Sequence, residues 1–314
     1  MSETAGAPRA PSLDALLRCP ESGAPLRRED DAYVSPSGRR WPIVREVPRF
    51  VADDRYVSSF SFEWNTHSRT QLDARTGGTW SEEIFRAKTG LTPEDVRGKV
   101  VLDAGVGAGR FSELLARWGA GRLVGADLSY AVEAARDNLR PHPNASVVQA
   151  DIGHPPFAPA TFDLIISIGV LHHTSDTRAH FERLLPLLKP GGTVCIWVYP
   201  HEGDYLTRNA WIPFTRRIPS EVFYRWCRWF VPLALKHPHS LAVQYIGQLF
   251  PFSNQGFGLE NDILDTFDAY SPWFHWTHTP EEVSAWFRAA GLRDVRVMPW
   301  NTSVRGVKPS DAAS

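Results

Sequence analysis

The sequence predicts an α/β protein built on a doubly wound, mostly parallel seven-stranded sheet. First, apolar runs of strand length alternate with helix-length stretches from about residue 99 onward, which is typical of right-handed β-α-β units with helices on both faces of a sheet. Second, the first of these runs leads into a glycine-rich turn, the place where doubly wound sheets bind ligands. Third, 43% hydrophobic and 22% charged residues are ordinary for a globular protein with a buried core.

The expected elements of the sheet domain follow one another in regular order. Strands are predicted at 100–105, 122–128, 145–151, 162–170, 193–199, 292–300 and 301–307. Helices are predicted at 81–88, 110–119, 129–139, 180–188 and 279–291. Ser81 is placed to cap the first of these helices.

The alternation is interrupted at 200–279, and this insertion is rich in tryptophan and phenylalanine. It follows the carboxyl end of a predicted strand, which is the edge of a doubly wound sheet at which ligands bind. We therefore interpret it as an aromatic helical cap over the site. The alternative is a helical addition with its own core and no contact with the substrate.

The rest of the chain divides into shorter segments. Residues 1–12, rich in Pro, Ala and Ser, are predicted to be a disordered tail, and residues 13–50 a small β-rich module with a Ser-Pro-Ser-Gly turn. Residues 51–98 connect this module to the sheet domain and include the stretch FEWNTHSRTQLD. Two roles are open for this stretch: a lid over the site, or packing against the core. The sheet domain with its insertion is expected to span 99–306, followed by a tail at 307–314.

Charge and cysteine content argue against several classes of protein. A net charge of −1 gives no overall electrostatic case for binding nucleic acid or an anionic membrane. Three widely spaced cysteines do not suggest a disulfide framework, so a reducing cytoplasm is expected. The N-terminal stretch lacks a basic start followed by a long apolar run, and no segment approaches ~20 apolar residues, so neither a signal peptide nor a membrane span is predicted.

The turn after the first core strand favours a cationic, nucleotide-like cofactor. Gly105 and Gly107 let bare backbone approach such a ligand, because a Cβ there would collide with it or require positive φ. Asp127 ends the second strand, 22 residues after Gly105. A carboxylate at this place can accept hydrogen bonds from both hydroxyls of a ribose. A dinucleotide-binding turn would require glycine in place of Arg110, and Asp103 would bring negative charge close to a pyrophosphate. S-adenosylmethionine has no phosphate and carries a positive sulfonium, so the turn favours it.

Five stretches of the sequence then resemble one family. DAGVGAGRF, GADLS, VVQADIGHPPF, FDLIISIGVLHH and LLKPGGTVCIWVY are similar to motifs of the class I S-adenosylmethionine-dependent methyltransferases, in particular the type 11-like members. The resemblance is close over about residues 98–200 and loose over 280–300. It implies S-adenosyl-L-methionine as the cofactor, and it says little about the methyl acceptor.

The resemblance also implies a role for each matched position. Leu128 would lie on the adenine, Asp151 would accept its amino group, and Ile152 would flank the ring. Backbone around Ile168 and Gly169 would line the methionine portion. The full set implied to bind the cofactor is Asp103, Gly105, Gly107, Gly109, Asp127, Leu128, Asp151, Ile152, Ile168 and Gly169.

Two further motifs leave alternatives open. His172 and His173 follow the fourth core strand, where a histidine could act as a general base near the methyl group, although such pairs also hold a loop by hydrogen bonds. The N-terminal stretch LLRCPESGAPLRRED resembles the small zinc-ribbon-like module found beside some methyltransferases. Those modules begin with Cys-Pro-x-Cys, whereas here Ser22 stands where the second cysteine would be, three residues after Cys19. The likeness is therefore degenerate, and no metal is expected.

The predicted function is transfer of a methyl group from S-adenosylmethionine to a small or medium-sized organic acceptor, with O-, N- and C-methylation all open. Such transfer needs mainly a positioned acceptor and excluded water, which an aromatic cap would provide. A homodimer is also considered. The alternatives are an NAD(P)-dependent oxidoreductase on a Rossmann sheet and a non-catalytic scaffold with the methyltransferase fold.

Overall fold

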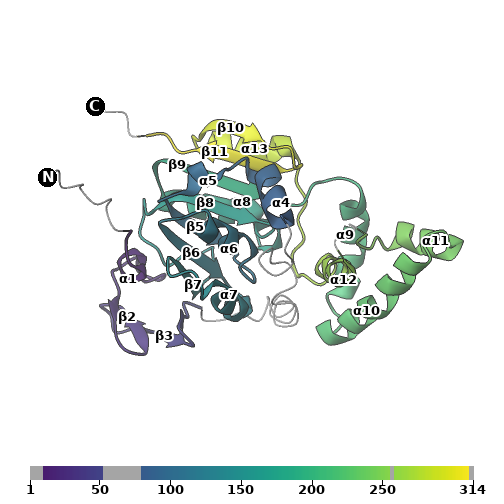
Figure 1. Ribbon diagram of the computed structural model, residues 1–314, viewed down its shortest axis with the longest axis horizontal. Coiled ribbons are helices and arrows are strands. Elements are labelled where there is room, and N and C mark those ends of the chain that lie inside the picture. The colour runs from purple at the N-terminus through teal and green to yellow at the C-terminus, as the bar shows by residue number, and fades with distance from the viewer. Residues whose placement is uncertain (1–9, 52–78, 255–257, 311–314) are drawn as a thin grey trace.

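The computed structural model describes residues 10–51, 79–254 and 258–310. Its core is a seven-stranded sheet with the order β10-β11-β9-β8-β5-β6-β7, in which β11 is antiparallel to both neighbours and the other pairs are parallel (Figure 1). This confirms the predicted fold class. The strands are β5 (Val100–Ala104), β6 (Arg122–Asp127), β7 (Ala145–Gln149), β8 (Phe162–Ile168), β9 (Leu188–Trp197), β10 (Arg293–Val297) and β11 (Ser303–Val307). The proposed lid sequence at 62–73 and parts of both predicted tails lie outside the described residues.

Helices cover both faces of this sheet, because successive side chains of a strand point to opposite sides. The helices are α4 (Trp80–Thr89), α5 (Pro93–Val96), α6 (Arg110–Arg117), α7 (Ala131–Leu139), α8 (Thr177–Leu184) and α13 (Pro280–Ala289), with short 3₁₀ turns η2 (Leu171–His173) and η3 (Leu185–Leu187). In β5, Val101 belongs to a buried cluster with Leu114 of α6, whereas the next residue, Leu102, belongs to another cluster with Phe181 of α8. The strands are therefore buried on both sides, which explains their nearly continuous apolar sequence.

The start of α4 differs from the prediction. The helix begins at Trp80, and Thr79 occupies its N-cap position. The hydroxyl of Ser81 instead accepts a hydrogen bond from Nε of Arg110 at 2.9 Å. The prediction that Ser81 caps this helix is wrong, because its side chain makes a tertiary contact with the start of α6.

In its described residues, 200–254 and 258–279, the insertion forms four helices (Figure 1). They have an aromatic core of their own. These helices are α9 (Asp204–Thr215), α10 (Ser220–Lys236), α11 (Leu241–Leu249) and α12 (Leu259–Asp268). The ring of Phe250 stacks on Tyr270 with centroids 4.0 Å apart. Both ends of the insertion leave the sheet side by side, because His201 N donates to His278 O and His278 N donates to Tyr199 O, each at 2.9 Å. The helical insertion predicted from the interrupted alternation is confirmed.

The N-terminal residues form a small four-stranded antiparallel sheet, which confirms the predicted β-rich module. Its elements are α1 (Leu13–Leu16), β1 (Arg27–Arg28), β2 (Ala32–Val34), β3 (Arg40–Val44) and β4 (Val47–Pro48). Arg49 forms a parallel bridge with Gln149, and Phe50 N donates to Gln149 O at 2.7 Å. The chain leaving the module therefore continues the large sheet beyond β7. Tyr33, Trp41 and Phe50 join the core cluster on that face of the sheet.

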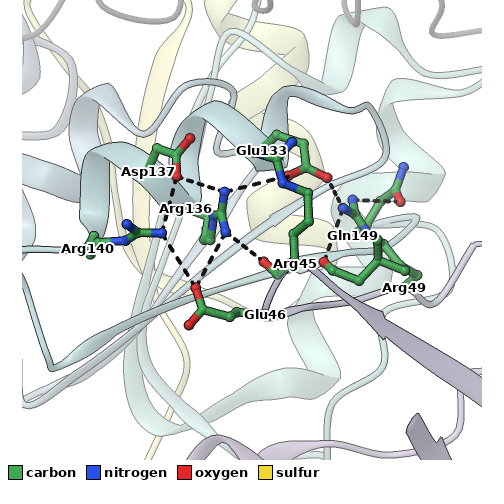
Figure 2. A network of polar contacts seen from close by, with 9 residues as sticks. Arg45, Glu46, Arg49, Glu133, Arg136, Asp137, Arg140 and Gln149 are labelled. Carbon is green, nitrogen blue, oxygen red and sulfur yellow. Dashed lines mark hydrogen bonds and ion pairs between the residues drawn. The ribbon is translucent and has the colours of Figure 1, made fainter. Parts of the chain in front are cut away.

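A network of charged residues fixes this module against α7 and β7 (Figure 2). The side chain of Arg49 is 7% exposed; it donates to Oε1 of Gln149 at 3.1 Å and pairs with Glu133 of α7. Arg45 lies 3.4 Å from the other carboxylate oxygen of Glu133. Arg136 donates to the backbone carbonyl of Arg45 at 3.0 Å. Buried charge is thus paired at the point where the module meets the sheet domain.

Among the described residues, no group of three or more His, Cys, Asp or Glu side chains is arranged to hold a metal ion. Cys19 is buried as a free thiol, and the likeness of the module to a zinc ribbon stays a prediction. Within the same ranges, no helix has the length and apolarity needed to cross a bilayer.

Candidate functional site

A cavity of about 300 Å³ lies at the carboxyl ends of the parallel strands. Residues that follow β5, β6, β7, β8 and β9 line it, together with α4 and the start of α6. The insertion contributes Arg208, Asp265 and Asp268 to the lining. Ligands of doubly wound sheets bind at this edge. The predicted cofactor turn and part of the insertion therefore share one cavity.

The glycine-rich turn gives the cavity a wall of bare backbone. Gly105 and Gly107 line the cavity and have φ values of 94° and 51°. A Cβ on Gly105 would lie 2.2 Å from Cγ2 of Val170, so a side chain there would displace the chain after β8. Gly109, the third predicted glycine, is not among the lining residues. It occupies the N-cap of α6 with φ 91°, where a Cβ would contact Leu139 of α7.

Asp127 lines the cavity with both carboxylate oxygens oriented by hydrogen bonds. Oδ2 accepts the N–H of Gly107 at 3.0 Å, and Oδ1 accepts the N–H and hydroxyl of Ser129 at 2.9 Å and 2.7 Å. Burial raises the pKa of Asp127, whereas these bonds from Ser129 and Gly107 lower it. These bonds use three of the roughly four acceptor sites of the carboxylate. The free site on Oδ2 can accept a hydrogen bond from one ribose hydroxyl, and the rotatable hydroxyl of Ser129 can give up its place to the second.

Asp103 lies beneath the turn and is 3% exposed. It accepts a hydrogen bond from the hydroxyl of Ser112 at 2.7 Å. Burial raises the pKa of Asp103 to about 7; the bond from Ser112 lowers it and the charge of Asp127 raises it further. A cation entering the cavity would favour the ionised carboxylate, whereas a phosphate would oppose it. This acid therefore favours a cationic ligand.

The other predicted cofactor residues line two further walls. These residues are Leu128, Asp151 and Ile152 after β6 and β7, and Ile168 and Gly169 at the end of β8. The N-terminal module reaches the first wall through Gln149, whose side-chain amide donates to the carbonyl of Leu128 at 2.8 Å. Because Arg49 holds the oxygen of the same amide, the module supports the backbone next to Asp127.

The two predicted histidines lie in different positions. His173 lines the cavity, and its Nδ1 lies 2.9 Å from the carbonyl of Phe274 in the insertion. Burial lowers the pKa of His173 to about 4, so this ring is neutral near pH 7. His172 is not among the lining residues; its ring stacks on Tyr199 with centroids 3.7 Å apart. Of the two, His173 has the position that a proton acceptor would need.

Sequence reasoning missed one face of α4. Trp80, Ile84 and Lys88 lie four residues apart and all line the cavity; this spacing was visible in the sequence. Nζ of Lys88 lies 3.2 Å from the ring centroid of Trp197 and 5.1 Å from that of Trp300. Among the described residues it has no hydrogen-bond or ion-pair partner. Burial lowers the pKa of Lys88 well below its ordinary value, and the charge of a neighbouring arginine adds to this.

The insertion closes the cavity with charged and polar groups. The hydroxyl of Tyr199, just after β9, donates to Oδ2 of Asp268 at 3.3 Å. Burial and the neighbouring Asp268 raise the pKa of Asp265 to about 6. Aromatic composition alone predicted a cap, but the sequence did not identify Arg208 or Asp265 as lining residues, since their position depends on how α9 and α12 pack.

The residues of the cavity fit S-adenosylmethionine in shape and charge. The absence of a side chain on Gly105 lets the turn pack against Val170, so that backbone of the turn lines the cavity. Asp127 presents an oriented acceptor to the ribose. Leu128 and Ile152 provide apolar surface for a flat base. Asp103 would be ionised next to a bound cation, which suits a sulfonium and disfavours a pyrophosphate.

Comparison with known proteins agrees with this geometry. Residues 102–196 match a family described as a methyltransferase domain. The chain is 33% identical to a tRNA U34 carboxymethyltransferase of Ruthia magnifica, over 32% of this chain and 33% of that protein. It is 25% identical to a demethylmenaquinone methyltransferase of Clavibacter sepedonicus, over 73% of this chain and 82% of that protein. Among solved structures, an S-adenosylmethionine dependent methyltransferase from Mesorhizobium loti is 28% identical to this chain. The match covers 32% of this chain and 47% of that chain, with a TM-score of 0.31.

The fold and the cavity agree with the match of residues 102–196 to a methyltransferase domain family, and S-adenosylmethionine is the cofactor that the lining residues fit. The matched segment begins in β5 and ends in β9, so it contains the glycine turn, Asp127 and Asp151. The chain spans only about a third of the length of the first curated relative. The N-terminal module and the helical insertion lie outside the matched segment.

Proposed function

We propose that this chain transfers the methyl group of S-adenosylmethionine to a small or medium-sized organic acceptor that enters beneath the helical insertion. One observation carries this proposal: residues of the cofactor turn and of the insertion line the same cavity. An acceptor held by the insertion would thereby lie next to the methionine end of the cofactor. Trp197, Tyr199 and Trp300 also line the cavity, which suits an apolar or ring-shaped acceptor.

The protein's part in this reaction is mainly orientation and exclusion of water. S-adenosylmethionine, when bound, supplies an activated methyl group on a cationic sulfur. Asp127 would hold the ribose and Asp103 would favour the positive charge, while the aromatic walls keep water from the reacting atoms. Where the acceptor must lose a proton, the neutral ring of His173 and the carboxylate of Asp265 are the lining groups suited to take it.

The relatives include a demethylmenaquinone methyltransferase and a tRNA U34 carboxymethyltransferase. The first agrees with the aromatic walls of this cavity. For this chain we favour an organic ring or chain over a nucleic acid, because the insertion places the acids Asp265 and Asp268 in the lining of the cavity, where they would oppose a phosphate backbone.

Binding measurements on the purified chain test the proposal against its two alternatives. Calorimetry is expected to show binding of S-adenosylmethionine and of S-adenosylhomocysteine, and fluorescence is expected to show no binding of NADH. Nicotinamide binding without S-adenosylmethionine binding would support the oxidoreductase instead. Transfer of labelled methyl from the cofactor to quinone-like or phenolic acceptors would exclude a non-catalytic scaffold.

Lys88 is expected to bind the carboxylate of the cofactor's methionine portion. Lys88→Met should weaken S-adenosylmethionine binding by about tenfold, since a charge-assisted hydrogen bond contributes roughly 1.5 kcal/mol. Binding of 5′-methylthioadenosine, which lacks the carboxylate, should change little. Calorimetry with both ligands measures the difference, with Lys99→Met at an exposed lysine as the control. Equal losses for the two ligands would contradict this role.

A further inference from the structure

The outward side of the insertion exposes large apolar side chains in regular rows. On α10, Val222, Trp229 and Leu233 are exposed and lie seven and four residues apart, which places them on one side of the helix. Trp229 is 63% exposed. The opposite side of α10 buries Phe223 and Phe230 in the core of the insertion. This helix is therefore apolar on its outer side as well as on its inner side, which solvent alone does not explain.

The next helix packs against the core of the insertion only through partly buried residues such as Val243. α11 contains no buried residue, and Leu241, Tyr245 and Leu249, four residues apart, are all exposed. Leu241 is 82% exposed. Figure 1 shows α10 and α11 at the end of the molecule opposite the N-terminal module. We call these two rows, with the basic residues beside them, the outer face of the insertion.

Positive charge accompanies the apolar rows. Arg225, Arg228 and Lys236 are exposed on α10. By helical periodicity Arg225 and Lys236 lie beside the row that contains Trp229, and Arg228 lies further round the helix on the same side as Arg225. Between residues 216 and 258 the sequence has five Lys or Arg residues and a single acid, Glu221. The net charge of −1 for the whole chain conceals this concentration. A large apolar surface next to a basic surface is typical of helices that lie in the interface of an anionic bilayer.

We propose that the outer face of the insertion binds the surface of an anionic lipid bilayer, with α10 and α11 lying in the headgroup region. Trp229 and Tyr245 have the apolar body and polar tip that favour this region. Arg225, Arg228 and Lys236 would contact the lipid phosphates. This surface role goes beyond the proposed reaction and does not depend on it.

Co-sedimentation of the full chain with lipid vesicles tests the proposal. The chain is expected to bind vesicles that contain phosphatidylglycerol and to bind pure phosphatidylcholine vesicles much more weakly, with the difference reduced by salt. Trp229→Ser should weaken binding to both. The double variant R225E/R228E should reduce binding to anionic vesicles by at least about tenfold, because each basic residue near such a surface contributes roughly 1 kcal/mol.

Matched variants separate a lipid role from a general effect of charge or folding. R293E/R296E changes the charge by the same amount at exposed positions of β10 and should leave vesicle binding close to wild type. Calorimetry with S-adenosylmethionine checks that each variant keeps its cavity. Equal binding of R225E/R228E and wild type to anionic vesicles would overturn the proposal. So would light scattering that shows a lipid-independent dimer dissociated by Trp229→Ser, which would assign this face to a second copy of the chain.

Discussion

Asp127→Ala should lower the affinity for S-adenosylmethionine by about 100-fold or more. The carboxylate is oriented by Gly107 and Ser129 and would accept both ribose hydroxyls. Loss of two charge-assisted hydrogen bonds at roughly 1.5 kcal/mol each accounts for this factor. The same substitution removes the acceptor that holds the N–H of Gly107, so the turn itself would be less well ordered. Calorimetric titration with S-adenosylmethionine and S-adenosylhomocysteine measures the effect.

Ser129→Ala is the graded control for this prediction. It removes one of the bonds that orient the carboxylate and leaves the carboxylate in place, so its effect on affinity should be much smaller than that of Asp127→Ala. Thermal unfolding of both variants shows whether the sheet is intact. An Asp127→Ala protein that binds the cofactor as tightly as wild type would refute the assignment of the cavity.

Arg49→Ala should lower the free energy of unfolding by about 2 to 3 kcal/mol. Removing one partner of a buried ion pair costs roughly 3 to 5 kcal/mol when the other charge is left alone. Here Glu133 would keep Arg45 and Arg136, so a value below that range is expected. Urea-induced unfolding, followed by fluorescence, measures the change.

The same variant should also weaken cofactor binding by a few-fold, because Arg49 fixes the amide of Gln149 that holds the carbonyl of Leu128. Arg45→Ala is the matched control: Arg45 contacts the same Glu133, but its side chain is 60% exposed, so its loss should cost at most about 1 kcal/mol. Equal destabilisation by the two variants would show that burial of Arg49 is unimportant. Unchanged cofactor affinity in a folded Arg49→Ala protein would remove the link to the cavity.

Local patterns were sufficient to predict the sheet domain and its cofactor turn. The order of apolar runs predicted the strands, and the glycines followed by Asp127 predicted the edge at which the cavity lies. These features are local because a strand, its turn and its helix are contiguous in the chain. The close approach of Gly105 to Val170, in contrast, depends on the pairing of β5 with β8, and the sequence suggested only that bare backbone was needed.

Contacts between distant segments could not be predicted in the same way. Arg49 meets Gln149 across 100 residues, and no spacing rule connects them. Ser81 has the composition of a helix cap, yet its partner is Arg110, because tertiary contact overrides local preference. Composition was also misleading on charge, since averaging over the whole chain conceals the basic residues of α10.

The paired entry and exit of the insertion have an evolutionary consequence. Its two ends meet at His201 and His278, and its aromatic core includes no residue of the sheet. A segment attached in this way can be exchanged or lengthened without rebuilding the strands below it. Selection for new acceptors can therefore act on residues 200–279 while the handling of the methyl donor is inherited unchanged.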